Sequence, residues 1–272
     1  MPTLGFIGAG NMAEAIARGL LRTALYQPAD IKATDPNADR QRVFSDQLGI
    51  TCKEDCQKAA AGSDTVILAV KPFVMAEALQ QIAPQLRTQS LIISIAAGIS
   101  STFIEQAISS GGGTPQPRVV RVMPNTPMLV GKGMSALARG SYATEHDLIA
   151  AERIFSSGGN TVRVTEPLMD AVTAVSGSGP AYIFYLTESL TQAGVAAGLT
   201  ELQAGQLARQ TVIGSAALLE QSKDAPGELR RKVTTPNGTT QAAIETLQAG
   251  DFAGLMTKAV AAAARRSKEM GK

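Results

Sequence analysis

The chain has 272 residues, of which 44% are hydrophobic and 18% charged, and its 25 basic side chains nearly balance its 23 acidic ones. This length fits one large or two modest domains, and the apolar share is that of an ordinary globular protein. The charge balance provides no basic surface for nucleic acid, two cysteines exclude a disulfide framework, and a single histidine (His146) excludes histidine-rich metal sites and makes a Ser-His-Asp hydrolase hard to build.

Targeting and membrane signals are missing from the sequence. No unbroken apolar run reaches the length of a membrane helix, and the first residues lack the basic region and cleavage site of a signal peptide. We therefore expect a cytoplasmic protein, in a reducing compartment, with neither a membrane nor a nucleic acid as a partner.

Short apolar runs alternate with helical patterns over the first 165 residues. An amphipathic helix is predicted over residues 11–24, and strands are predicted at 3–7, 31–34, 50–52, 65–70, 91–96, 119–123 and 135–138. The runs at 65–70 and 91–96 are apolar at consecutive positions, as in strands covered on both faces. This alternation predicts a parallel sheet with helices on both faces, so residues 1–165 are interpreted as a Rossmann-like, doubly wound α/β domain.

Helical patterns without strands follow from residue 166 to residue 272. Apolar and small residues recur at helical spacing in stripes that begin at Ile183, Ala204 and Phe252. The segment 176–180 (SGSGP) predicts a break, with Pro180 as the first residue of a new helix. Because the side chains in these stripes are small, the domain can bury only a thin hydrophobic core by itself. We therefore predict an all-helical dimerisation domain over 166–272, completed by a second copy of the chain.

The segment Gly8–Ala13 reads G-x-G-x-x-A, directly after a predicted strand and at the start of a predicted helix. Gly8 permits the tight turn, Gly10 lets a pyrophosphate approach the backbone, and Ala13 lets the helix pack closely on the strand. The free N–H groups of the first helical turn would meet the phosphate charge. The context predicts a dinucleotide site; the alternative is a tight strand–helix turn without a ligand.

Two charged positions bear on this cofactor. Asp35 follows the second strand, where an acidic residue binds the ribose hydroxyls of NAD and repels a 2′-phosphate, whereas Arg40 and Arg42 could attract that phosphate. Alternatively, Asp35 and Pro36 only begin a helix, as its N-cap and first residue. Lys71 ends the fourth strand at the edge where ligands bind in open sheets, facing either the cofactor or solvent.

Three further segments go beyond a generic dinucleotide domain: 121–127 (RVMPNTP), 175–182 (VSGSGPAY) and 233–240 (VTTPNGTT). Together with GFIGAGNMA at 5–13 and AVKP at 69–72, they resemble the pyrroline-5-carboxylate reductases, in order along essentially the whole chain. The resemblance implies a Rossmann domain, a helical dimerisation domain and dimers that can assemble five together into a decamer. It implies hydride transfer from NADPH or NADH (NADP or NAD) to the C=N bond of L-Δ1-pyrroline-5-carboxylate, giving L-proline.

The resemblance also implies roles for particular residues. The cofactor would bind at Ile7, Gly8, Ala9, Gly10, Asn11, Met12 and Asp35, and its nicotinamide half at Val70, Lys71, Pro72, Ala96 and Ala97. The substrate carboxylate would bind at Gly238, Thr239 and Thr240, contributed across the dimer, and Thr240, as the catalytic residue, would hydrogen-bond the ring nitrogen.

Two positions depart from the family pattern. Asn237 replaces a usual glycine, and since Asn tolerates positive φ better than other side chains, we expect the turn to survive. Many members carry Ser, Thr or Arg near Asp35, so the carboxylate here favours use of NADH beside, or in preference to, NADPH.

Imine reduction needs a hydride donor, an anchor for the substrate and little else. A protonated C=N carbon is already electrophilic, so orientation of the nicotinamide can supply most of the catalysis. This suits a chain with one histidine and no evident acid–base pair. The N–H groups at a helix start near Thr239 and Thr240 can hold a carboxylate, although an ordinary threonine N-cap is the alternative.

Two rival functions fit parts of the sequence. A β-hydroxyacid dehydrogenase shares the glycine turn, but that class has a lysine four residues after a G-x-G where this chain has Ile183, and no lysine lies between Lys132 and Lys223. A non-catalytic NAD(P)-binding sensor would bind the cofactor without consuming it. The intact 238–240 segment argues against the sensor.

Overall fold

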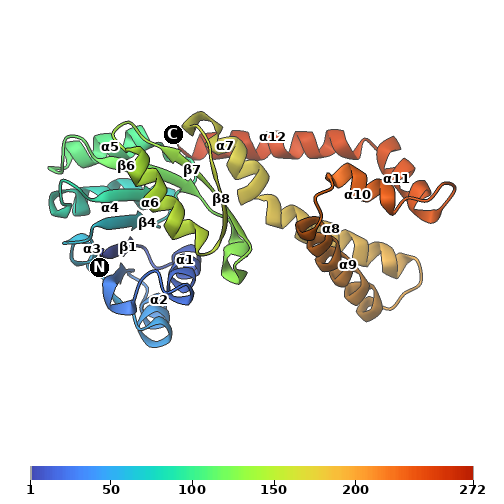
Figure 1. Cartoon of the computed structure of the whole chain (residues 1–272), viewed down its shortest axis with the longest axis horizontal. Coiled ribbons are helices and arrows are strands. Elements are labelled where there is room, and N and C mark those ends of the chain that lie inside the picture. Colours follow the sequence, from blue (N-terminus) through green and yellow to red (C-terminus); the bar gives the residue numbers. More distant parts are fainter. Residues whose placement is uncertain (1, 272) are drawn as a thin grey trace. The chain divides into compact units, whose positions relative to one another are not determined.

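The computed structural model describes residues 2–271 and divides the chain into two compact units, Met1–Ser178 with Ala263–Lys272, and Gly179–Ala262 (Figure 1). This division differs from the boundary at residues 165 and 166 that the sequence predicts. The segment after residue 165 is helical as expected, but its Met169 is buried with Ala136 and Ala138 of the sheet. Burial of an apolar side chain thus holds this helical segment in the first unit.

The first unit is built on an eight-stranded sheet in the order β3-β2-β1-β4-β5-β6-β7-β8. The strands are β1 (Leu4–Ile7), β2 (Ile31–Thr34), β3 (Thr51–Lys53), β4 (Thr65–Leu68), β5 (Leu91–Ser94), β6 (Arg118–Met123), β7 (Gly133–Arg139) and β8 (Gly159–Arg163). All seven predicted strands are present, β2 with the predicted bounds and the other six with shifted ends, and the Rossmann-like fold class is confirmed.

Three features of the sheet differ from the sequence expectation. β7 is antiparallel to β6, because the short connection between them, residues 124–132, cannot make a parallel crossover. β8 was not expected, since it is an edge strand with a polar, mostly exposed sequence and no apolar run. β4 and β5 end two residues earlier than predicted, so the residues after Leu68 and Ser94 leave the sheet at its carboxyl edge.

Among the described residues, seven α-helices lie wholly within the first unit, which also contains the end of α12 (Phe252–Met270). They are α1 (Asn11–Arg22), α2 (Ala38–Arg42), α3 (Cys56–Ala60), α4 (Met75–Ile82), α5 (Ser101–Ser110), α6 (Glu145–Ser156) and α7 (Met169–Val172). α1 begins at the predicted residue and ends two residues before the predicted end. His146 lies exposed in the first turn of α6.

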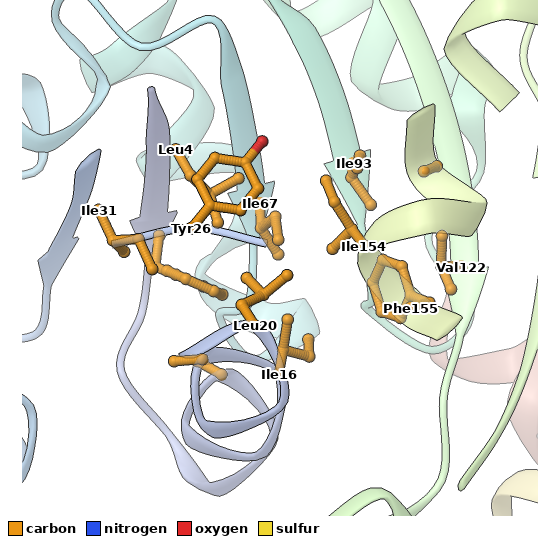
Figure 2. Packing of buried hydrophobic residues seen from close by; sticks show 14 of the residues in the cluster. Leu4, Ile16, Leu20, Tyr26, Ile31, Ile67, Ile93, Val122, Ile154 and Phe155 are labelled. Atoms are coloured by element: carbon orange, nitrogen blue, oxygen red, sulfur yellow. The ribbon is translucent and has the colours of Figure 1, made fainter. Parts of the chain in front are cut away.

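Apolar layers cover both faces of the sheet. On one face, Ile16 and Leu20 of α1 and Phe155 of α6 pack against the strands (Figure 2). On the other face, α4 and α5 bury their apolar sides against the same strands. Consecutive residues of β1 therefore serve different layers, Phe6 the first and Ile7 the second. This explains why the central strands are apolar at every position.

The second unit is all-helical, as predicted. It contains α8 (Gly179–Ala196), α9 (Glu201–Gln221), α10 (Pro226–Lys232), α11 (Thr239–Ala249) and the first part of α12 (Phe252–Met270), and no strand occurs in the described residues after 165. The break predicted at 176–180 is present as a bend at Ser178, which a π-helical turn over Thr173–Gly177 precedes. The new helix, α8, starts at Gly179, so Pro180 lies in its first turn, where proline needs no N–H donor.

The apolar faces of helices α8 and α9 in the second unit are exposed. Within its described residues only Ala204 and Ala208 are buried hydrophobic side chains. The large exposed apolar side chains of α8 and α9 include Ile183, Phe184, Tyr185, Leu186, Leu190, Leu202, Leu207, Ile213 and Leu218. A second copy of the chain, expected from the sequence, would bury such a surface. Of the described helices, none combines the length and apolar composition that crossing a membrane requires.

Candidate active site

The glycine turn after β1 lies directly against the end of β4. Gly8 has φ +96°, and a Cβ at this position would lie 2.8 Å from the carbonyl oxygen of Ala69 and 3.1 Å from the nitrogen of Val70. Only glycine accepts both this backbone conformation and this approach. The structure thus brings two of the predicted cofactor segments, 7–12 and 70–72, side by side.

The start of α1 is open. Gly10 is the N-cap, with extended backbone and no side-chain cap, and a Cβ placed on it would meet no other atom within 4 Å. Asn11 is exposed and Met12 half-buried, while Ala13 is fully buried under the helix. An open backbone at a helix N-terminus is the cradle that a pyrophosphate needs, so the residues present fit a dinucleotide.

Two charged side chains from the second βα connection hold the middle of this turn. The N–H of Ala9 donates to Oδ2 of Asp35 at 2.8 Å, and Nε of Arg40 donates to the carbonyl of Ala9 at 2.7 Å. Arg40 also pairs with Glu14 of α1 at 2.7 Å. Asp35 and Arg40 therefore determine the geometry of a turn that lies more than 25 residues away in the sequence.

The reading of Asp35 and Pro36 as a helix start is wrong. The N-cap of α2 is Asn37, whose side chain accepts the N–H groups of Asp39 and Arg40. Asp35 instead accepts the N–H of Asn37 at 2.9 Å with its second oxygen. The arginines considered for a 2′-phosphate already have partners, Arg40 as above and the exposed Arg42 in an ion pair with Asp39.

The segments predicted to face the nicotinamide follow two adjacent parallel strands. β4 and β5 pair in register, and the N–H of Ile95 donates to the carbonyl of Leu68 at 3.1 Å just beyond the strands. Val70, Pro72 and Ala97 are half-buried and Ala96 is buried. The side chain of Lys71 is exposed, as in the solvated alternative. Both segments thus leave the same carboxyl edge as the glycine turn.

Asn125 joins the first two of the three resemblance segments. Its Nδ2 donates to the carbonyl of Ser176 at 3.2 Å, and its Oδ1 accepts the N–H of Met134 at 2.8 Å. Ser176 lies in the π-helical turn before α8, where the N–H of Ser178 reaches back to the carbonyl of Thr173 at 2.8 Å. Asn125 therefore fixes the point from which the chain enters the helical unit.

The third segment forms the start of α11 in the second unit. Asn237 has φ +57°, so the turn survives its departure from glycine as predicted. The N-cap is Gly238, which has no side-chain cap, so the threonine N-cap alternative is wrong. The side chain of Gln241 accepts the N–H of Asn237 at 2.8 Å, outside the helix. Thr239 is exposed and Thr240 half-buried in the first turn, whose N–H groups can accept an anion.

Comparison with known proteins identifies the family. Residues 166–270 match the family model for pyrroline-5-carboxylate reductase dimerisation, and residues 3–98 match the model described as NADP oxidoreductase, coenzyme F420-dependent. The pyrroline-5-carboxylate reductase of Synechocystis is 42% identical over 269 residues, which cover 99% of this chain and 98% of that protein. This chain belongs to the pyrroline-5-carboxylate reductase family.

Solved pyrroline-5-carboxylate reductases share the whole fold. The structure from Coxiella burnetii has a TM-score of 0.90 and 34% identity, covering 100% of this chain and 99% of its own. The structure from Plasmodium falciparum, described with NADP bound, has a TM-score of 0.87 and 30% identity, and the match covers 100% of this chain and 98% of that chain. The resemblance predicted from the sequence motifs is confirmed.

Family membership accounts for the open helical unit. The pyrroline-5-carboxylate reductase dimerisation model covers residues 166–270, which include α8 and α9 with their exposed apolar side chains. The chain is thus a homodimer-forming pyrroline-5-carboxylate reductase. The sequence assigned no role to Glu14 at the cofactor turn or to Arg121 on β6. Glu14 holds Arg40, and Arg121 is a buried cation on β6 paired with Glu166 at 2.8 Å. No short-range pattern marks either pair.

Proposed function

We propose that this chain reduces L-Δ1-pyrroline-5-carboxylate to L-proline with NADPH or NADH. The 42% identity to a named pyrroline-5-carboxylate reductase, in an alignment that covers 99% of this chain, carries the proposal, and the open glycine turn at Gly10 supports it. When bound, the cofactor supplies a hydride to the carbon of the C=N bond, whose protonated nitrogen keeps its proton in the product amine. The products are L-proline and the oxidised cofactor.

The first unit holds the cofactor. The N–H groups at the start of α1, from Asn11 onward, take the pyrophosphate, and Asp35 lies at the ribose end of the site. The segments 70–72 and 96–97 line the nicotinamide half. Support comes from the shared carboxyl edge on which all these segments end, which is where ligands bind in open α/β sheets.

The start of α11 binds the substrate. The N–H groups of its first turn hold the carboxylate, and the hydroxyl of Thr240 hydrogen-bonds the ring nitrogen. Support comes from the N-terminus of α11 at Gly238, which no side chain caps. The side chain of Gln241 accepts the N–H of Asn237, outside the helix, and so does not cap the first turn either. The sole histidine, His146, is exposed, so orientation of the two reactants supplies most of the rate enhancement.

Assembly and location complete the proposal. In the homodimer, the 238–240 segment of one subunit serves the nicotinamide of the other, as the resemblance implies. Five dimers form a decamer, which sedimentation velocity would measure directly.

We place the enzyme in the cytoplasm, where a reducing environment keeps the thiol of Cys52 free.

The decisive experiment follows oxidation of NADPH and NADH in parallel with L-pyrroline-5-carboxylate present. We expect one or both cofactors to be consumed while L-proline appears in equal amount. Binding of cofactor without turnover of this imine would contradict the proposal. It would favour a reductase of a related imine or the non-catalytic sensor.

Replacing Asp35 tests cofactor preference. Asp35→Ser removes a negative charge near the expected 2′-phosphate, so we expect the ratio of kcat/KM for NADPH to that for NADH to rise about tenfold, roughly 1.4 kcal/mol. Asp46→Ser removes an exposed charge from the segment that follows α2 and is the control. An unchanged ratio in Asp35→Ser would mean that this carboxylate only supports the turn through Ala9.

The exposed stripe of α8 tests the dimer. Ile183 and Leu190 lie seven residues apart on one helix face and are both exposed. We expect Ile183→Glu/Leu190→Glu to convert the dimer to monomer in light scattering and to abolish imine reduction, because charges oppose burial of this face. Gln80→Glu, an exposed change on α4, should leave the dimer intact. A dimeric, active double variant would exclude this face as the interface.

A further inference from the structure

The loop between β5 and α5 carries Ala96 and Ala97, and the end of α12 lies directly against it. Gly98 in this loop has φ +77°, and a Cβ there would lie 2.7 Å from the carbonyl oxygen of Ser267 and 2.9 Å from the nitrogen of Gly271. A Cβ on Gly271 would in turn collide with the carbonyl of Gly98. Backbone packs on backbone, so a shift of either segment displaces the other.

The end of α12 is itself tied to α7. Ser267 is only 3% exposed and is the one buried residue of that helix, although its side chain is polar. Its hydroxyl donates to Oδ1 of Asp170 at 2.7 Å. Asp170 and Ser267 are 97 residues apart in the sequence. This hydrogen bond therefore joins the last turns of the chain to the segment that precedes the helical unit.

Glu166, just before α7, forms hydrogen bonds with the residue that follows the β5–α5 loop. One carboxylate oxygen accepts the N–H of Ser101 at 2.7 Å and Nη1 of Arg121 at 2.8 Å, and the other accepts the hydroxyl of Ser101. Ser101 is 2% exposed and is the first residue of α5, immediately after the loop. The carboxylate thus anchors the far end of the loop and neutralises a buried guanidinium.

The charge state of this carboxylate follows from the same contacts. Burial alone would raise the pKa of Glu166, but hydrogen bonds from Ser101 and the ion pair with Arg121 outweigh burial and lower it. Glu166 is therefore ionised near neutral pH.

We propose that Glu166 and Asp170 are positioning residues for the nicotinamide half of the site, acting through the loop at 96–101. The contacts form a closed ring in the first unit: from the loop at Gly98 to Ser267, from Ser267 to Asp170, and from Glu166 at the start of the same short segment back to Ser101. The inference rests on the proposed function in placing the nicotinamide against Ala96 and Ala97.

The ring also involves both segments that connect the two units in the chain. The first unit ends at Ser178 and resumes at Ala263, so Glu166 and Asp170 precede one connection and Ser267 follows the other. The segment before the first connection bonds to the end of the β5–α5 loop through Glu166 and Ser101. The segment after the second connection packs against the same loop through Ser267 and Gly98. Breaking one contact should therefore disturb the orientation of the nicotinamide more than the affinity for the cofactor, because the pyrophosphate binds elsewhere, at α1.

Full-length Glu166→Gln and Asp170→Ala test the ring independently. We expect kcat to fall about fivefold or more in each, with the Kd for NADPH changed less than about twofold. With 4-deuterated NADPH, we expect the kinetic isotope effect on kcat to rise, because misorientation slows hydride transfer itself. A merely structural role would lower Tm without changing this isotope effect.

Two further variants provide the comparison. Asp170→Asn keeps an oxygen that accepts from Ser267 and should retain the wild-type kcat. Glu152→Gln removes an ion pair with Arg163 on β8, outside the ring, and should leave kcat and the isotope effect unchanged. Wild-type kcat and isotope effect in both Glu166→Gln and Asp170→Ala would overturn the inference while leaving the proposed function intact. A wild-type enzyme that consumes no cofactor with the imine would instead overturn the proposed function.

Discussion

Gly10→Ala is expected to raise the KM for NADPH and NADH at least tenfold, about 1.4 kcal/mol or more, without lowering Tm by more than about 2 °C. Gly10 has ordinary extended backbone, and a methyl group there meets no atom of the protein within 4 Å. The fold therefore tolerates alanine. The methyl group would occupy the space that the pyrophosphate needs.

Gly8→Ala is the matched comparison, two residues away on the same turn. There a Cβ would meet the backbone of Ala69 at 2.8 Å, at a φ of +96° that alanine rarely adopts. We expect this variant to lose about 2 kcal/mol or more of folding free energy. Thermal unfolding and cofactor titration of the two variants separate a stability effect from a binding effect. A wild-type cofactor KM in Gly10→Ala would contradict the placement of the pyrophosphate.

Thr240→Ala should lower kcat/KM for L-pyrroline-5-carboxylate about 10- to 100-fold while leaving the Kd for NADPH unchanged. The size follows from losing a hydrogen bond of about 1.5–3 kcal/mol to a group that is charged during reaction. Thr246→Ala removes a hydroxyl from the same helix, where it bonds only the local backbone, and should retain activity. Parallel loss of imine turnover and cofactor binding in Thr240→Ala would contradict its proposed role.

Gly10→Ala and Thr240→Ala together test whether the active site is shared across the dimer. If each site takes its cofactor from one subunit and Thr240 from the other, a mixed dimer of Gly10→Ala and Thr240→Ala contains one site with both changes and one intact site. At a cofactor concentration too low for Gly10→Ala to turn over, co-expression of the two impaired chains should then restore about a quarter of wild-type activity, since about half of the dimers are mixed. No recovery would show that one subunit supplies both residues.

Local sequence was sufficient to predict most of the first unit. The apolar runs of β4 and β5 and the glycine turn after β1 each depend on residues within a few positions, and each was found at the predicted place, although both strands end two residues early. β8 escaped prediction because an edge strand needs few buried side chains, and the sequence GNTVR has no apolar run. The break predicted at 176–180 also depends on local residues, and it occurs at Ser178, directly before Gly179 and Pro180 in the first turn of α8.

The sequence by itself determined the fold class, the family and the order of the site segments, because these depend on short motifs and on hydrophobic periodicity. Only the tertiary structure decided what the charged residues do. Asp35 and Arg40 bond opposite sides of Ala9, and Glu166 bonds Ser101 and Arg121, across separations of 26 to 65 residues. Such contacts depend on strand order and on the edge at which each loop emerges. Periodicity within one segment carries no information about either.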